Sequence, residues 1–235
     1  MQPFYGSAII LSLENLSKVQ DKGEFIIRAR ALSNLAIKEK SVYVVYRLAV
    51  LLDERNYSIR KLEGFVCASR NPFFILRFAL IVRGANIKRL QSAIVRLGNA
   101  VEIANFAAWV KGSDRELLQD IVIKSKNPKA AYTLLRNYRE ANINRLKNIL
   151  LASKKPRYVF LLATKLKNKE EIKLIEDIII NGTSNMYVRL FAKYVGGNIK
   201  RLEERIIQTQ DIWEMKKFAA DVPGCERINN LLLLV

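Results

Sequence analysis

The sequence contains no histidine, so it lacks the side chain that proteins use most often as a general base and as a metal ligand. Cysteine is nearly absent as well, since Cys67 and Cys225 are the only two. They lie far apart and in no metal-type spacing, and a disulfide framework needs more of them. Both fall within apolar helical patterns, which predicts buried free thiols in a reducing compartment.

Long apolar runs are also missing. The longest, from Phe73 to Val82, is interrupted by Arg77 and is too short to cross a bilayer. The segment from Met1 to Ser7 carries no basic residue, whereas a secretory signal normally begins with positive charge. We therefore expect a cytoplasmic protein without a signal peptide or a transmembrane segment.

Acidic residues are outnumbered, because the 235-residue chain has 40 Lys and Arg against 22 Asp and Glu, a formal charge of +18. Half of the residues are hydrophobic, which is enough for a continuous core and argues against disorder. The positive charge favours an anionic partner, such as nucleic acid, an acidic membrane surface or an acidic protein. The alternative is that the charge keeps a surface-rich molecule in solution.

The central part of the chain lines up with itself at a period of 28 residues, because Asn71, Asn99 and Asn127 each begin a similar block. Such a period is typical of stacked helical repeats. In the first helix of each unit, an apolar stripe is centred on the doublets Leu48-Ala49, Phe78-Ala79, Phe106-Ala107, Leu134-Leu135, Leu162-Ala163, Phe191-Ala192 and Phe218-Ala219. The second helices have an anchor column at Leu62, Leu90, Leu118, Leu146, Ile175, Leu202 and Ile228.

Polar residues, prolines and glycines fall where these helices are expected to begin and end. Side chains that can cap the first helices are Asn71, Asn99, Asn127, Ser184 and Asp211, and those for the second helices are Ser58, Asn86, Asp114, Asn142 and Asn198. Prolines 72, 128 and 156 occupy first helical positions, and glycines 84, 112, 196 and 224 fall where first helices end.

The sequence therefore predicts an all-α fold, a right-handed α-solenoid of about eight stacked antiparallel helix pairs with a repeat of about 28 residues. We expect a single domain over residues 1–235, with a degenerate N-terminal helix pair in 1–40, regular repeats in 41–210 and a C-terminal capping pair in 211–235. The apolar ending, residues 231–235, either folds back onto the last pair, which we favour, or contacts another molecule.

Basic residues recur in register with the repeat. A first column, just after the first helix, contains Arg83, Lys111, Arg139 and Lys167. A second column, one residue before the anchor of the second helix, contains Lys61, Arg89, Arg145, Arg201 and Arg227. A third set closes the second helices and contains Arg70, Lys126 and Lys154, with Lys129, Lys155 and Arg157 just beyond.

The helix dipole has opposite effects on the cations of the first two columns. A cation at a helix C-terminus, as in the first column, complements the dipole, whereas a cation in the first turn, as in the second column, is disfavoured by it. The second column is therefore the stronger candidate for phosphate contacts, and a plain solvated face is the alternative.

Other side chains give weaker signals. We expect most of the aromatic residues of the first helices to pack in the core, with Trp109 and Tyr194 partly exposed, where they could stack on unpaired bases. No Gly-rich phosphate loop, metal spacing or nucleophile–base pair is found, so no enzyme, metal or cofactor is expected. The acidic pairs at 170–171 and 203–204 are expected on helix surfaces as partners of nearby lysines and arginines.

The phrases Gly-Ala-Asn-Ile-Lys-Arg-Leu at 84–90 and Gly-Gly-Asn-Ile-Lys-Arg-Leu at 196–202, with the Asn-Pro openings, resemble short αα-repeats of phage and bacterial proteins of unassigned function. Over residues 41–235 the chain also resembles α-solenoids of the HEAT or armadillo type. The resemblance implies the architecture. HEAT-like DNA glycosylases are basic solenoids of similar size, although no position here matches their catalytic acid.

We expect a non-enzymatic helical-repeat protein that binds DNA or RNA through the phosphate backbone, largely independently of sequence, by means of the first and second columns. The alternative is a protein–protein interaction scaffold or inhibitor, such as a phage-encoded viral protein, that grips an acidic protein. A HEAT-like DNA glycosylase is the third possibility. No membrane partner is expected.

Overall fold

A computed structural model describes residues 5–234, with side chains from residue 9 onward, and within that range the chain is all-helical. Residues 1–4 and 235, on which the expectations for the N-terminal segment and the apolar ending partly fall, lie outside the described residues. None of the helices in the described part is long and apolar enough to span a bilayer.

The chain divides into two compact units, Met1–Ile121 and Val122–Val235, and the division falls within α8 (Arg115–Lys124). The helices of unit 1 are α1 (Tyr5–Ser17), α2 (Lys22–Lys38), α3 (Val42–Glu54), α4 (Arg60–Ala68), α5 (Pro72–Ile81), α6 (Ile87–Arg96) and α7 (Ala100–Trp109). Those of unit 2 are α9 (Pro128–Asn137), α10 (Ile143–Ala152), α11 (Pro156–Ala163), α12 (Lys169–Ile180), α13 (Asn185–Tyr194), α14 (Ile199–Gln208), α15 (Ile212–Asp221) and α16 (Glu226–Leu232).

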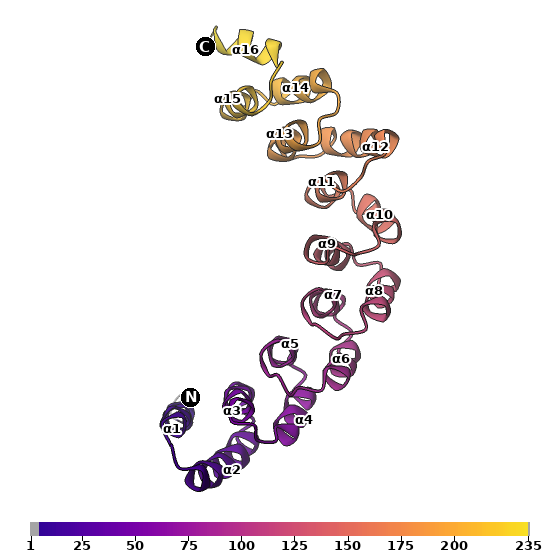
Figure 1. Cartoon of the computed structure of the whole chain (residues 1–235). Coiled ribbons are helices and arrows are strands. Elements are labelled where there is room, and N and C mark those ends of the chain that lie inside the picture. Colours follow the sequence, from indigo (N-terminus) through magenta and orange to yellow (C-terminus); the bar gives the residue numbers. More distant parts are fainter. Residues whose placement is uncertain (1–4, 235) are drawn as a thin grey trace. The chain divides into compact units, whose positions relative to one another are not determined.

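Within each unit the helices form two rows (Figure 1). In unit 1, α3 contacts both α4 and α5, and α4 contacts α6; in unit 2, α11 contacts both α12 and α13, and α12 contacts α14. Odd-numbered helices therefore stack on odd-numbered ones and even-numbered on even-numbered ones. This is the packing of a helix-pair repeat, in which neighbouring pairs bury the apolar stripe that one pair leaves open.

The core lies between the two rows, and both predicted stripes are confirmed. The first member of each doublet is fully buried, as at Phe78, Phe106 and Phe191. The anchor column of the even-numbered helices is buried along its whole length. Each such side chain contributes about 1.5–3 kcal/mol relative to an exposed one.

Most of the predicted helix caps are confirmed. Asn99 and Asn127 accept hydrogen bonds from first-turn backbone N–H groups of α7 and α9, and Asn86 and Asn198 do the same for α6 and α14. One expected cap, Ser58, is wrong, because α4 begins only after Ile59. Ser184 precedes α13 but makes no side-chain capping bond.

The ends of the odd-numbered helices differ at one glycine. Gly112, Gly196 and Gly224 have positive φ, as expected of left-handed caps, but Gly84 does not. At that turn the Asp53 carboxylate accepts hydrogen bonds from the backbone N–H groups of residues 83 and 84, at 2.7 and 2.9 Å. A side chain from the preceding pair thus holds the turn.

Buried carboxylates tie three of the even-numbered helices, α4, α12 and α14, to the next even-numbered helix. Glu63 on α4 is 3% exposed, and its Oε2 accepts from the backbone N–H of Asn86, the N-cap of α6, at 2.7 Å. Glu176 on α12 reaches Asn198, the N-cap of α14, in the same way at 2.9 Å. The carboxylate therefore satisfies a helix-end donor and lies at the positive end of the next helix dipole.

The same bond recurs elsewhere in both units. Glu203 on α14 accepts from Ile228 N on α16 at 2.8 Å, and a neutral side chain, Gln91 on α6, accepts from Asp114 N at 2.8 Å. Glu203 is 2% exposed, so its expected position on the helix surface is wrong. At these places, the side chain directly after the anchor residue forms a hydrogen bond to the next repeat, which we call the linker bond.

The favoured fold-back of the apolar ending is also wrong for the described residues. Leu233 and Leu234 are 85% and 83% exposed, and α16 ends at Leu232. Helix α16 has only seven residues and ends before these two leucines, so they do not lie on its packed face.

Replacing Glu203 with Ala should lower the free energy of unfolding by about 1–3 kcal/mol, because a buried backbone N–H of α16 loses its acceptor. Glu203→Gln keeps an oxygen at that place, as Gln91 does in unit 1, and should cost clearly less. Urea unfolding followed by circular dichroism measures both. Equal losses in the two variants would show that the linker bond is not what stabilises α16.

Candidate nucleic-acid interface

The second basic column is engaged in bonds between repeats. Arg89 Nη1 lies 3.3 Å from Glu63 Oε1, so this arginine binds the same buried carboxylate that caps α6. Arg201 repeats the arrangement in unit 2, with Nη1 3.2 Å from Glu176 Oε1 and Nη2 2.8 Å from Asp177 Oδ1. The last of these bonds raises the pKa of Arg201 above its ordinary value.

The other members of that column also have partners. Lys61 donates to Asn34 Oδ1 at 2.7 Å, and Arg227 pairs with Glu204. Arg145 is not a free cation either. From the sequence we expect these cations to be available because the dipole disfavours them, but carboxylates one repeat earlier offset the dipole at Arg89, Arg201 and Arg227. The recurring acid after the anchor residue was the signal that could have revealed this.

The first column is different. The side chains of Arg83, Lys111, Arg139 and Lys167 are exposed in the turns that follow α5, α7, α9 and α11, and none makes an ion pair or a side-chain hydrogen bond within residues 9–234. Acidic residues lie in or beside these turns, including Asp53 near the end of α3, Glu140 after α9 and Glu170 in the first turn of α12. This edge of the helix rows therefore carries charge of both signs.

Within each unit, the opposite edge, where even-numbered helices end and odd-numbered ones begin, is more uniformly basic. We call it the C-terminal edge. Its cations are Lys38, Lys40, Arg70 and Arg96 in unit 1, and Lys124, Lys126, Lys129, Lys154, Lys155 and Arg157 in unit 2. All ten are exposed, and none is in an ion pair with a described residue. In these five turns, 38–40, 69–73, 96–101, 124–129 and 153–157, Glu39 is the single acid. The turn between α12 and α13, 181–184, has no charged residue, and the turn between α14 and α15, 209–211, has Asp211 and no cation.

Several of these cations stand where glycine would fit the backbone best. Lys40, Arg70, Lys126 and Lys154 have φ of 53°, 56°, 50° and 51°, in the left-handed region that L-residues adopt at a cost. Gly98 occupies the same place after α6, with φ of 70°. Local backbone geometry therefore does not explain the cations, although each one also complements the C-terminal dipole of its helix.

Five aromatic rings of the odd-numbered helices are exposed, and for three of them, Tyr43, Phe73 and Trp213, the expected core packing is wrong. Tyr43, Phe73, Trp109, Tyr194 and Trp213 are between 42% and 63% exposed. The partial exposure expected for Trp109 and Tyr194 is confirmed. The outer positions of a helix in the odd row contact no other row, so a ring there has little to pack against.

In unit 1 these rings form a groove of about 420 Å³ between α3 and α5. Tyr43 and Phe73 both pack against Phe74, at centroid distances of 6.4 and 5.2 Å. The Arg77 guanidinium lies 5.2 Å from the centre of the Phe73 ring, and Arg47 also lines the groove. Apolar surface and positive charge are thus combined on the odd row.

In unit 2 the odd-numbered helices are linked by charge. Asp221 on α15 accepts from Lys193 Nζ on α13 at 2.7 Å and also pairs with Arg189. Lys193 and then Arg189 lower the pKa of Asp221. Because the folded-state pKa is depressed, this contribution to stability is present at neutral pH and is lost as the pH falls through that pKa.

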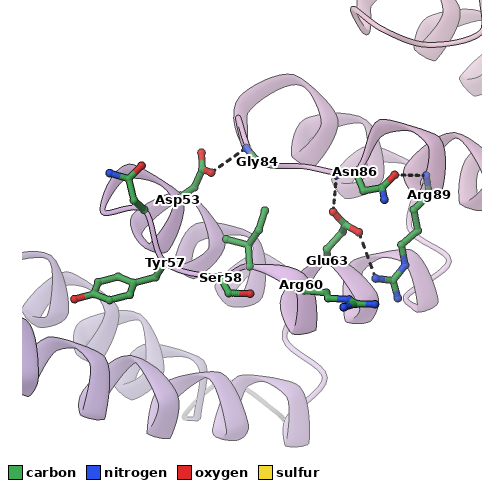
Figure 2. Close-up of a pocket in the computed structure, with 10 residues that line it drawn as sticks. Asp53, Tyr57, Ser58, Arg60, Glu63, Gly84, Asn86 and Arg89 are labelled. Carbon is green, nitrogen blue, oxygen red and sulfur yellow. Dashed lines mark hydrogen bonds and ion pairs between the residues drawn. The ribbon is translucent and has the colours of Figure 1, made fainter.

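A cavity of about 810 Å³ lies between the α3–α4 and α5–α6 turns of unit 1 (Figure 2). Two carboxylates line it, and both bind the protein itself: Asp53 accepts from Gly84 N, and Glu63 accepts from Asn86 N and pairs with Arg89. Structural bonds therefore organise this cavity. Over residues 9–234, no group of three or more His, Cys, Asp or Glu is placed to hold a metal ion.

Comparisons with known proteins identified no related protein. No family model, curated protein or solved structure matches the chain.

Replacing Arg89 or Arg201 with Gln should lower the midpoint of thermal unfolding, because each change leaves a buried carboxylate with one partner fewer. Arg83→Gln removes an equal charge from an unpaired side chain and should leave the midpoint unchanged. Circular dichroism melting curves compare the three variants. Equal midpoints for all of them would mean that the second column contributes nothing to folding.

Proposed function

We propose that this protein binds nucleic acid through the phosphate backbone, largely without reading base sequence, and that it catalyses no reaction. The observation that supports this best is the C-terminal edge, where ten exposed cations have no acidic partner within the described part of the chain. Cations that are not neutralised within the protein are available to phosphate oxygens, and their binding releases condensed counterions.

The spacing of these cations suits a polyanion. Packed helices lie about 8–10 Å apart, so one cation per repeat gives a row with that spacing. Duplex DNA carries one charge per about 1.7 Å of axis, so such a row meets phosphates without matching particular base steps. Contacts of this kind position a nucleic acid without specifying its sequence.

We further propose that the helix pairs build one right-handed α-solenoid of about eight pairs over residues 1–235, of the HEAT or armadillo type. The same neighbour contacts recur in both units, which supports this architecture. In it the first column, Arg83, Lys111, Arg139 and Lys167, forms a second and weaker basic edge, because acids are interspersed there. The second column serves mainly to join repeats.

The test uses glycine, which removes charge and also suits the left-handed backbone. The double variant Lys126→Gly/Lys154→Gly should bind a short DNA duplex more weakly than the wild type, with a salt slope that is less steep by about one per lysine. Its stability should stay within about 0.5 kcal/mol, because glycine relieves the strain but loosens the unfolded chain. Fluorescence anisotropy across a salt series and urea unfolding measure the two effects.

A matched control removes the same charge from the opposite edge. Lys61→Gln/Arg227→Gln should keep most of the affinity. If the control loses as much affinity as the glycine variant, overall charge and not the C-terminal edge is responsible. If the glycine variant binds like the wild type, the proposed interface is wrong.

A second candidate function is a scaffold or inhibitor that grips an acidic protein. The groove between α3 and α5 favours it, because Tyr43 and Phe73 are exposed beside Arg47 and Arg77. Exposed aromatic residues and arginine are enriched where proteins bind proteins. This candidate requires that binding of an acidic polypeptide depend on Phe73 and that duplex binding be weak at physiological salt.

A further inference from the structure

A groove between α4 and α6 of unit 1 is lined by three arginines and by no carboxylate. Its volume is about 950 Å³, and the arginines are Arg70, Arg89 and Arg96. Small side chains make up much of the rest of its lining, which leaves the guanidinium groups accessible from the groove. Glu63, paired with Arg89, is the one carboxylate partner of the three arginines among the described residues. A cluster of like charges with so little counter-charge is costly for the protein alone and is stabilised when an anion binds.

Arg89 is held so that one end of its guanidinium stays open. Nη1 is 3.3 Å from Glu63 Oε1, and the other oxygen of that carboxylate is taken by the backbone N–H of Asn86. Nη2 lies over Gly64, close enough that a Cβ atom at this glycine would be 3.0 Å from it. Nη2 has no acceptor among the described residues.

The corresponding arginine of unit 2, Arg201, has a second carboxylate partner that Arg89 lacks. Arg201 also binds the buried Glu176, but Asp177, which stands where unit 1 has Gly64, accepts from its Nη2 at 2.8 Å. Gln208 occupies the position on α14 that Arg96 occupies on α6. The counterpart in unit 2 is therefore neutralised by side chains of its own repeat, and the groove of unit 1 is not.

The other two arginines come from helix ends. Arg96 is the last residue of α6, and Arg70 follows α4 with φ of 56°. Neither makes an ion pair or a side-chain hydrogen bond within the described chain. Guanidinium groups bind phosphate oxygens with paired, charge-assisted hydrogen bonds, and a lysine ammonium cannot reproduce that geometry.

We propose that the α4–α6 groove is a discrete phosphate-binding site, in which Arg89 Nη2, Arg70 and Arg96 bind the oxygens of one phosphate-bearing ligand. The ligand is either a phosphodiester of a nucleic acid or a free polyphosphate. The site goes beyond the proposed function, since it is a local pocket of unit 1 and does not require a row of cations.

Cys67 provides a probe of this groove, because it lines the groove and is partly exposed, whereas Cys225 is 1% exposed. Burial and then Glu63 raise the pKa of the Cys67 thiol, while Arg89 and Arg96 lower it. A bound phosphate offsets the arginine charges, so it should slow the reaction of Cys67 with a thiol reagent. Protection of Cys67 therefore reports occupancy of the groove.

The experiment places in unit 1 the acid that unit 2 already has. Wild-type protein should bind inorganic tripolyphosphate saturably in low salt, with slower Cys67 modification. Gly64→Asp should weaken that binding about tenfold, because the new carboxylate takes Nη2 of Arg89. Gly64→Ser, the residue at the equivalent position of α6, adds a side chain of similar size without charge and should stay within about twofold.

Folding of the variants is checked by thermal unfolding, and Arg96→Gln, which copies Gln208, offers a second route to the same loss. If Gly64→Asp and Arg96→Gln both bind tripolyphosphate as well as Gly64→Ser does, the proposal is overturned. The same holds if wild-type protein shows no saturable binding and no protection of Cys67 with either probe.

A second probe, a short single-stranded oligonucleotide, identifies the source of the phosphate. Protection of Cys67 by the oligonucleotide and by tripolyphosphate supports a nucleic-acid phosphodiester at this site, whereas protection by tripolyphosphate alone supports a free polyphosphate. The tripolyphosphate measurement on the wild type needs no nucleic acid, so the groove proposal can hold when the nucleic-acid proposal fails. Likewise, the nucleic-acid proposal can hold when the groove binds no tripolyphosphate.

Discussion

The structure depends on a carboxylate that is buried within one repeat and bonded to the start of the next. Three glutamates, Glu63, Glu176 and Glu203, directly follow the anchor residue of an even-numbered helix. Each accepts a hydrogen bond from a backbone N–H at the N-terminus of the following even-numbered helix. A buried carboxylate is costly unless its oxygens are bonded, so it fixes the position of the next helix closely. Apolar stripes alone allow neighbouring helices to slide, whereas this bond sets their register.

This constraint determines which cations are free. The carboxylate attracts an arginine from the first turn of the next helix, so Arg89 and Arg201 become part of the joint between repeats. Their position against the helix dipole is then stabilised by a buried negative charge. Ten cations without an ion pair among the described residues lie in the turns at the other end of the even-numbered helices, where Lys126 and Lys154 adopt a left-handed backbone.

Departures from the repeat carry most of the functional information in this molecule. Where unit 2 has Asp177, unit 1 has Gly64, and an arginine that elsewhere is fully paired keeps a free N–H edge beside Arg70 and Arg96. On the odd row, the rings of Tyr43 and Phe73 are exposed at positions where α9 and α11 of unit 2 have Lys129 and Arg157, and α15 has the exposed Trp213. The common scaffold is maintained by the anchor column and the linker bond, which leaves the outer positions free to differ.

The sequence by itself determined the helices, their caps and the apolar stripes, because each of these depends on residues within about one helical turn of one another. It also showed the basic columns and the cations at the C-terminal edge. It did not determine which cations are neutralised, because Arg89 meets Glu63 across 26 residues only when two repeats stack in one register. Exposure of Phe73 and the open edge of Arg89 over Gly64 were likewise decided by packing between helices, which a local spacing rule does not describe.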